Sequence, residues 1–274
     1  MDTHKTIDLG RLRIGAGHPL VVIAGPCVIE SESHALMLAR ELQIRCQEAG
    51  LPFVFKASFD KANRSSHDSF RGRGLEFGLS VLQRVREVCG VPVTTDVHLP
   101  EQAAQVAEVV DLLQVPAFLC RQTDLLQACA ETGRPVNVKK GQFMAPDAMG
   151  GVVGKLKDAR GVMLTERGTT FGHGDLVVDM RGLVQMRRFG FPLCFDATHS
   201  CQKPAGGPTT DGDRSMAAPL ARAAVATGVD AVFAEVHEHP ENAPSDGANM
   251  LRLEHFSDFL APLIDLDRLG GRQT

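Results

Sequence analysis

Reactive and ionisable side chains recur along this sequence, each placed directly after a short apolar run. Successive positions are roughly 30 residues apart, which is the length of a βαβ unit. Because the carboxyl ends of parallel strands meet at one edge of a sheet or one rim of a barrel, this spacing predicts a shared site. The residues at these run ends are Cys27, Lys56, Asp96, Gln114, Lys139, Glu166 with Arg167, His199 and Glu235.

One part of this set is cationic and suits anionic ligands. Lys and Arg pair with phosphate or carboxylate, and the Arg fork matches the geometry of both groups. A single basic residue in a loop is usually solvated surface. Five of them near run ends instead predict binding of two anionic groups: Lys56, Lys61, Arg64, Lys139 and Arg167.

The densest polar stretch is the segment 53–74, FVFKASFDKANRSSHDSFRGRG. Besides its lysines and Arg64 it carries Asn63, Ser65 and Ser66 within a few residues. Such a loop is either a solvated surface segment or a cradle for a phosphate group. We favour the cradle because Lys, Asn, Arg and two Ser fall within eleven residues of one another.

A second part of the set could bind a metal ion. Cys27, His199 and Glu235, with Asp246 in the following loop, offer a thiolate, an imidazole and two carboxylates. This mixture suits a divalent transition metal such as Fe²⁺, Zn²⁺ or Mn²⁺ with one position open for substrate. A cysteine in a Gly-Pro-Cys turn is otherwise a small buried apolar residue.

The remaining cysteines and histidines are expected to have other roles. Seven cysteines at irregular spacing predict free thiols. Cys201 lies near the predicted rim without needing to face a metal, and four histidines are expected on the surface: His4, His18, His34 and His255. Five cysteines are assigned to the apolar interior: Cys46, Cys89, Cys120, Cys129 and Cys194.

The elements that carry these residues alternate strictly. Near-continuous apolar runs predict buried parallel strands at 20–24, 53–56, 91–96, 112–115, 136–139, 162–165, 192–196 and 231–235. Amphipathic stretches predict helices at 33–49, 75–88, 102–109, 124–131, 151–157, 179–188, 216–227 and 253–266. Right-handed crossovers then allow a (β/α)8 barrel or a doubly wound sheet.

The barrel is favoured, because the strand count is eight and no Gly-rich dinucleotide fingerprint follows the first strand. We expect a single (β/α)8 TIM barrel domain over residues 1–274. Within it, residues 1–19 would form an N-terminal extension with a β-hairpin that closes the bottom of the barrel.

Composition excludes several classes of function. The 274 residues are 43% hydrophobic with a net charge of -4 and no Trp or Tyr, which argues against nucleic-acid binding. No run of 18 apolar residues predicts a membrane span. The polar N-terminus does not resemble a signal peptide, so a cytoplasmic location is expected.

Several motifs resemble 3-deoxy-D-manno-octulosonate 8-phosphate synthase over nearly the whole chain. They are AGPCVIES, FVFKASFDKANRSS, PAFLCRQTDLL, NVKKGQF, TERGTTFG, DATHS and AEVHEHPENAPSDG. The blocks KANRSS and FLCRQTDLL distinguish this family from the related 3-deoxy-D-arabino-heptulosonate 7-phosphate synthases. The resemblance implies a homotetrameric barrel enzyme that condenses phosphoenolpyruvate with D-arabinose 5-phosphate in lipopolysaccharide precursor biosynthesis.

The resemblance also implies roles for individual residues. Phosphoenolpyruvate would be held by Lys139, Arg167, Lys61 and Lys56, and Ser58 would also contact substrate. The sugar phosphate would be held by Asn63, Arg64 and Ser65, with Arg121 reaching the site of a neighbouring subunit. The residues assigned to the reacting centre are Lys139, Asp96, Gln114, Glu235 and His199. Cys27, His199, Glu235 and Asp246 match the metal-dependent branch, for which Fe²⁺, Zn²⁺, Mn²⁺ and Co²⁺ are candidate ions.

Other interpretations remain open from the sequence. The seven-carbon synthase would use erythrose 4-phosphate as the aldehyde, and a Schiff-base aldolase would use Lys56 or Lys139 as nucleophile. A phosphosugar-binding protein would explain the basic residues but not the Cys/His/Glu/Asp set. The loops 65–74 and 202–215 differ most from the family and are expected to close over substrate.

Overall fold

The computed structural model describes residues 5–62, 70–170, 174–204 and 211–269. Eight parallel strands form a closed barrel, since β11 pairs with both β8 and β14 and the remaining strands pair in sequence order. The barrel strands are β3 (Val21–Gly25), β4 (Phe53–Lys56), β5 (Val93–Asp96), β6 (Leu112–Val115), β7 (Val136–Lys139), β8 (Val162–Glu166), β11 (Leu193–Asp196) and β14 (Ala231–His237). The predicted (β/α)8 barrel is therefore confirmed.

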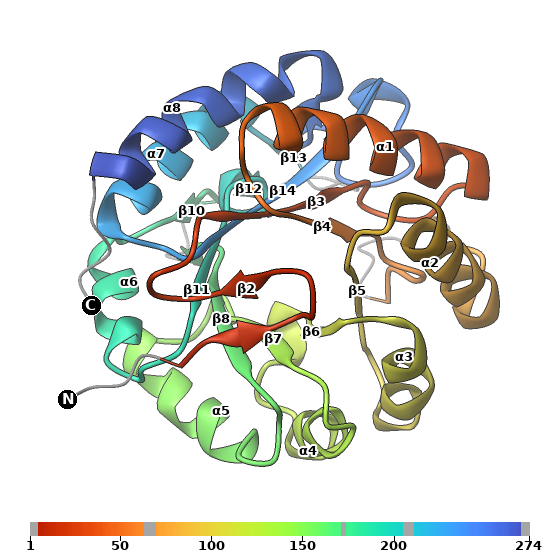
Figure 1. The fold of residues 1–274 in the computed structure, drawn as a ribbon. Helices are drawn as coiled ribbons and strands as arrows, with labels where there is room; N and C mark the ends of the chain where they lie inside the picture. Colours follow the sequence, from red (N-terminus) through yellow and green to blue (C-terminus); the bar gives the residue numbers. More distant parts are fainter. Residues whose placement is uncertain (1–4, 63–69, 171–173, 205–210, 270–274) are drawn as a thin grey trace.

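Eight helices surround the barrel (Figure 1). They are α1 (Glu32–Glu48), α2 (Leu75–Cys89), α3 (Ala103–Val109), α4 (Thr123–Glu131), α5 (Met149–Lys155), α6 (Arg181–Arg187), α7 (Ala217–Thr227) and α8 (Phe256–Leu269). Short 3-10 helices occupy Pro100–Gln102, Ala117–Leu119, Pro146–Ala148, His199–Cys201, Arg214–Met216, Pro240–Asn242 and Leu253–His255. None of the helices in the described part of the chain is long and apolar enough to cross a membrane.

The predicted element boundaries differ from the observed ones by a few residues. The third and seventh barrel strands begin at Val93 and Leu193, each directly after a proline that lacks the N–H a ladder needs. Helix α5 begins at Met149, two residues before the prediction, and α8 continues to Leu269. None of these shifts moves a strand end away from the rim.

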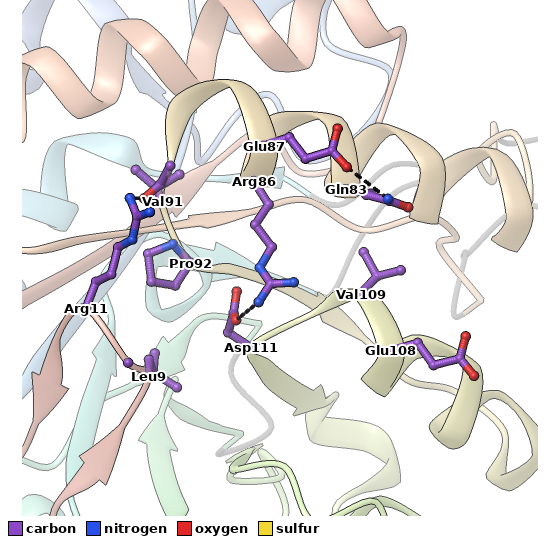
Figure 2. A pocket seen from close by; sticks show the side chains of 12 residues that line it. Leu9, Arg11, Gln83, Arg86, Glu87, Val91, Pro92, Glu108, Val109 and Asp111 are labelled. Atoms are coloured by element: carbon purple, nitrogen blue, oxygen red, sulfur yellow. Dashed lines mark hydrogen bonds and ion pairs between the residues drawn. The ribbon is translucent and has the colours of Figure 1, made fainter.

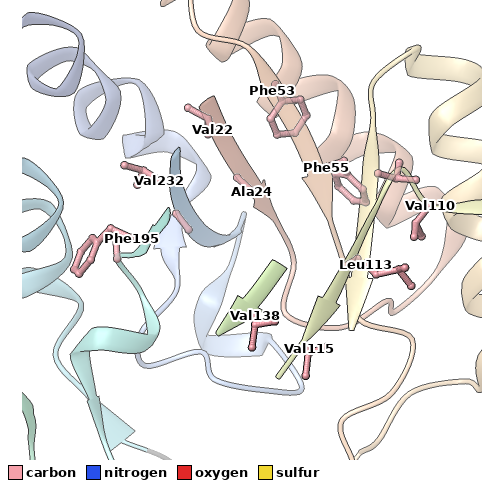
Figure 3. Close-up of a cluster of buried hydrophobic side chains, with 14 of the residues drawn as sticks. Val22, Ala24, Phe53, Phe55, Val110, Leu113, Val115, Val138, Phe195 and Val232 are labelled. Atoms are coloured by element: carbon pink, nitrogen blue, oxygen red, sulfur yellow. The ribbon is translucent and has the colours of Figure 1, made fainter. Parts of the chain in front are cut away.

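Apolar side chains fill the space between the barrel and its helices. All residues of the eight barrel strands are buried, as expected for strands covered on both faces. Part of this layer is shown in Figure 3, where Val22, Phe55, Val138 and Phe195 come from strands far apart in the sequence.

A second, smaller apolar cluster fills the barrel at the N-terminal ends of its strands. The hairpin of β1 (Ile7–Asp8) and β2 (Arg13–Ile14) crosses this end, as Figure 1 shows. Its Ile7 and Ile14 are 1% and 0% exposed and pack with strand residues such as Met163 and Phe233. The hairpin therefore closes the bottom of the barrel as predicted, and the opposite rim is left for chemistry.

Short strand pairs outside the barrel lie at its C-terminal rim. The segments β9 (Thr169–Thr170) and β10 (Leu176–Val177) pair after β8, and β12 (Gln202–Lys203) pairs with β13 (Asp211–Gly212) after β11. In addition, β15 (Leu251–Arg252) pairs in parallel with the end of β14.

Candidate active site at the C-terminal rim of the barrel

The rim brings together most of the residues predicted from the strand ends. The chain passes from β3 close over β4 at Gly25, where a Cβ atom would collide with the carbonyl of Lys56. This close approach places the Cys27 turn beside the end of β4. The sequence predictions for Asn63, Arg64 and Ser65 fall outside the described residues.

Lys56 lies at the centre of a buried polar group on the floor of the site. Its ammonium donates to Ser58 Oγ at 2.8 Å and lies 3.5 Å from Asp96 Oδ2 and 3.4 Å from Glu235 Oε1. Lys61 approaches the same Glu235 oxygen at 3.7 Å. The two lysines and two carboxylates are at most 9% exposed, so each charge depends on its partners rather than on water.

Asp96 is oriented by a chain of amides that crosses adjacent strands. Gln114 Nε2 donates to Asp96 Oδ1 at 2.6 Å, and Asn137 Nδ2 donates to Gln114 Oε1 at 3.0 Å. The hydroxyl of Thr165 donates to Asn137 Oδ1 at 2.7 Å, which fixes the direction of the whole chain. Asn137 was not predicted as a site residue, although its polar side chain inside an apolar strand was a signal.

Asp196 holds two predicted residues together. Its Oδ2 lies 2.6 Å from Lys139 Nζ and 2.8 Å from His199 Nδ1. Lys139 also lies 3.8 Å from the centre of the Phe233 ring, a cation–π distance. Sequence reasoning did not select Asp196, and its position at the end of a buried strand was the available signal.

A potential metal site lies beside this group. One ligand atom each from Cys27, Glu235 and Asp246 lies within 4.8 Å of the others. Cys27 Sγ is 3.1 Å from Asp246 Oδ2, and His199 Nε2 is 3.6 Å from Glu235 Oε1. Asp246 has a φ of 52°, the only positive φ of a non-glycine residue in the described ranges. The backbone at this ligand is therefore held in a conformation that costs conformational free energy.

The donor set of this cluster fits a divalent transition ion. A buried thiol beside two carboxylates and an imidazole matches the ligand types of such metals. Without a cation, burial raises the pKa of the Cys27 thiol well above its ordinary value, and Glu235 adds to the effect. A bound divalent ion would reverse this, because coordination deprotonates a thiol.

The carboxylates of the rim are held ionised. Burial alone would raise the pKa of Asp96, but Lys56, Lys61 and Lys139 outweigh it and lower the pKa well below its usual range. Burial also opposes ionisation of Glu235, and His199 with the two lysines again lowers its pKa. Both groups therefore carry negative charge at neutral pH.

Arg167 is the cation with unused hydrogen-bonding capacity. It is 4% exposed, one terminal nitrogen donates to Gln202 Oε1, and Nη1 is buried with no partner among the described residues. Burial lowers its pKa, opposed by Asp196 and Glu166. A buried, unpaired guanidinium N–H is costly, so this group is suited to an anionic ligand.

Arg121 does not join this group of residues. It is exposed, and its backbone carbonyl accepts a hydrogen bond from Lys155 at 2.8 Å. Its role at a neighbouring site stays a prediction.

Most cysteines and histidines outside the rim lie as predicted. His255 is exposed, whereas His18 is only half-buried, and His4 lies outside the described residues. All seven cysteines are free, as predicted, but Cys89 is only partly buried because it is the last residue of α2. The surface prediction for His34 is wrong: its side chain is 11% exposed, and it packs against His237 between Glu30 and Glu238. The backbone N–H of His239 donates to His237 Nδ1 at 2.9 Å, so Nε2 carries the proton and donates to Glu30.

A surface pocket of about 700 Å³ lies at the opposite end of the barrel (Figure 2). It is bordered by the hairpin, the end of α2 and the starts of β5 and β6. Its arginines are already engaged, since Arg86 pairs with Asp111 at 2.9 Å and Arg11 donates to the Gly90 carbonyl at 2.8 Å. We therefore assign the chemistry to the C-terminal rim.

The chain is similar to known proteins along nearly its whole length. A family model described as the DAHP synthetase I family matches residues 3–270. A protein of Cyanothece sp. (strain PCC 7425 / ATCC 29141) named 2-dehydro-3-deoxyphosphooctonate aldolase is 57% identical over 256 residues, which cover 92% of this chain and 94% of the relative. Relatives with the same name from Magnetococcus marinus and Geobacter sulfurreducens are 53% and 52% identical over 97% of this chain, and the matches cover 94% and 98% of those proteins.

Proposed function

The chain belongs to the DAHP synthetase I family, and from that premise we propose that it condenses phosphoenolpyruvate with D-arabinose 5-phosphate and water. The products are 3-deoxy-D-manno-octulosonate 8-phosphate and inorganic phosphate, and the product serves lipopolysaccharide precursor biosynthesis. The observation that carries this assignment is the rim, where buried Lys56, Lys61, Lys139 and Arg167 surround a Cys27–Glu235–Asp246 cluster.

The cations offset the repulsion between two anionic substrates. In the described part of the rim, however, four carboxylates already act on these cations: Asp96, Asp196, Glu235 and Asp246. Among these four cations, Arg167 is the one with a buried N–H that has no partner among the described residues, so it is the group that supports binding of the phosphoenolpyruvate anion. Positioning two reactants in this way contributes several kcal/mol to catalysis, and at most about 7–11 kcal/mol.

The reaction requires two proton movements that the rim residues can support. C3 of the enol phosphate bonds to the aldehyde carbon, and the aldehyde oxygen takes up a proton. Water adds at C2 and loses one proton. The bond between C2 and the phosphate oxygen then breaks, and the C2 hydroxyl passes its remaining proton to the departing phosphate as the C2 carbonyl forms. Lys139 donates the proton to the aldehyde oxygen, and ionised Asp96 or Glu235 accepts the proton that water loses. Gln114 and His199 orient these groups.

We further propose that Cys27, His199, Glu235 and Asp246 hold a divalent transition metal: Fe²⁺, Zn²⁺, Mn²⁺ or Co²⁺. When bound, such an ion supplies polarisation of an oxygen atom or orientation of a water molecule. The buried thiol and the 4.8 Å ligand cluster support this assignment.

The assay that tests the function measures phosphate release from phosphoenolpyruvate with arabinose 5-phosphate or erythrose 4-phosphate, with and without chelator. We expect release with arabinose 5-phosphate, loss of activity after chelation, and partial recovery with Mn²⁺, Co²⁺, Fe²⁺ or Zn²⁺. Preference for erythrose 4-phosphate would refute the substrate assignment. Full activity in metal-stripped enzyme would refute the metal assignment alone. Trapping with borohydride is expected to give no adduct, which separates this chemistry from a Schiff-base aldolase.

We propose a homotetramer in which Arg121 reaches the site of a neighbouring copy. The exposed side chains of Phe118 and Phe143, 55% and 57% accessible, follow β6 and β7 near Arg121 and support an interface between copies. Co-expressing Arg121→Ala with Cys27→Ala should restore part of the activity that each variant lacks alone, because a mixed oligomer contains intact composite sites. No restoration in a verified mixed oligomer would show that Arg121 acts within its own subunit or not at all.

A further inference from the structure

Lys140 and Glu166 are buried charged residues that the mechanism above does not use. They are 0% and 3% exposed, and Lys140 Nζ lies 3.5 Å from Glu166 Oε2. An ion pair removed from water in this way is weak evidence for stability, since desolvation offsets much of the attraction. Its position directly beside two proposed substrate-binding residues, Lys139 and Arg167, points to another role.

The Glu166 carboxylate binds the backbone at Arg167 and Gly168. One oxygen, Oε1, accepts the backbone N–H of Arg167 at 2.9 Å and that of Gly168 at 2.7 Å. The chain turns sharply here, because Gly168 has a φ of 94°, and a Cβ atom there would press against Leu176. The carboxylate therefore fixes the turn through which the Arg167 side chain enters the site.

Lys140 ties the same carboxylate to the neighbouring loop. Its ammonium donates to the carbonyls of Gly141 and Met144 at 3.4 and 3.3 Å, and to Thr169 Oγ1 at 3.1 Å. The loops after β7 and β8 are thus joined around one ammonium group. Because Lys139 is the preceding residue, two of the proposed phosphoenolpyruvate contacts, Lys139 and Arg167, start from this frame.

The Arg167 side chain starts from the backbone that Glu166 holds. Gln202 engages one terminal nitrogen, while Nη1 is buried without a partner among the described residues. We propose that Glu166 and Lys140 are positioning residues that aim Arg167 at the phosphoenolpyruvate anion. This inference rests on the function proposed above.

The test measures steady-state constants for both substrates and direct binding of phosphoenolpyruvate by calorimetry. Wild-type turnover is established first, so that failure of the proposed function is recognised separately. Glu166→Ala should raise KM and Kd for phosphoenolpyruvate about ten- to hundredfold, since it removes two charge-assisted hydrogen bonds. KM for the sugar phosphate should change much less.

Asp230→Ala is the matched control at the other end of the barrel. Asp230 is also fully buried, accepts a backbone N–H from Leu193 at 2.7 Å and pairs with Arg187 at 2.5 Å. Asp230→Ala should lower the thermal midpoint of unfolding, as Glu166→Ala does. Its KM for phosphoenolpyruvate should stay at the wild-type value. Equal KM changes in both variants, or an unchanged KM in Glu166→Ala, would overturn the inference.

A double variant keeps the inference testable even if Glu166→Ala does not fold. Lys140→Met/Glu166→Gln replaces the ion pair by a neutral pair, and the amide oxygen can still accept both backbone N–H groups. We expect the double variant to bind phosphoenolpyruvate more tightly than Lys140→Met or Glu166→Gln alone. Each single change leaves one buried charge, that of Glu166 or of Lys140, without its charged partner. Binding as weak as the summed effect of both single changes would overturn the inference.

Discussion

At the scale of single residues, the rim is built from buried groups that neutralise one another. Asp196 pairs with both Lys139 and His199, and Glu235 lies within 3.7 Å of Lys56, Lys61 and His199. Removing one member of such a group leaves a buried charge uncompensated. Substitutions here are therefore expected to alter protonation and geometry together.

Cys27→Ala should lose bound metal and activity together. The thiol is the softest of the four proposed ligands, and it faces Asp246 at 3.1 Å. The measurements are metal content by elemental analysis and phosphate release under matched metal supply. Metal binding at the wild-type stoichiometry and affinity in this variant would contradict the assignment of Cys27 as a ligand.

Cys201→Ala is the matched control for Cys27→Ala. Cys201 is also a buried free thiol close to the rim, but it donates to the Ala197 carbonyl at 3.1 Å and is not part of the ligand cluster. Both its metal content and its turnover should remain close to wild type.

At the scale of elements, the barrel separates stability from chemistry along its axis. The N-terminal hairpin fills one end with apolar side chains, whereas the polar rim residues occupy the strand ends and loops at the other end. A change in the hairpin should therefore affect unfolding without affecting substrate binding.

Ile14→Ala should reduce the free energy of unfolding by about 2–5 kcal/mol, the range for truncating a fully buried Ile. Ile14 is 0% exposed inside the barrel bottom, so the truncation leaves a cavity. Denaturant unfolding gives the stability, and kcat/KM of the folded protein should stay at its wild-type value. Arg13→Ala, next in sequence with an exposed side chain, serves as control. A large loss of kcat/KM in folded Ile14→Ala would show that the two ends of the barrel are linked.

At the scale of the whole molecule, the rim carboxylates make stability depend on acid pH. The pKa values of Asp96, Asp196, Glu235 and Asp246 are all lowered in the folded chain, by the cations beside them and against the effect of burial. Carboxylates in an unfolded chain titrate near pH 4. The stabilising contribution of these groups is thus complete above about pH 5 and decreases as the pH falls below about 4.

Asp96→Asn should flatten this acid dependence. The variant is less stable at pH 7, because Lys56 loses a partner at 3.5 Å, but its stability falls less between pH 5 and 3. Urea unfolding at several pH values measures how the free energy of unfolding depends on pH in the variant and in the wild type. Gln83→Ala, at an exposed position on α2 that donates to Glu87, should keep the wild-type dependence of stability on pH. An unchanged slope in Asp96→Asn would mean that Asp96 is not held ionised by its neighbours.

The fold and most of the rim could be predicted from the sequence for a geometric reason. Apolar runs repeated with intervening helical patterns specify parallel strands, and parallel strands present all their carboxyl ends on one side. The residues after those runs therefore had to meet, whichever strand order was adopted. Cys27, Lys56, Asp96, Lys139 and Glu235 were found in this way.

What only the tertiary structure decided is which of these side chains pair. Closure of the barrel brings Cys27 beside Asp246, 219 positions along the chain, and places Asp196 between Lys139 and His199. Periodicity reports which face of a strand is buried, but not which neighbour it meets across the barrel. His34 on α1 is covered by His237 at the end of β14, and Lys140 meets Glu166 at the end of β8. Both contacts join separate elements, and the periodicity of one element does not report its neighbour.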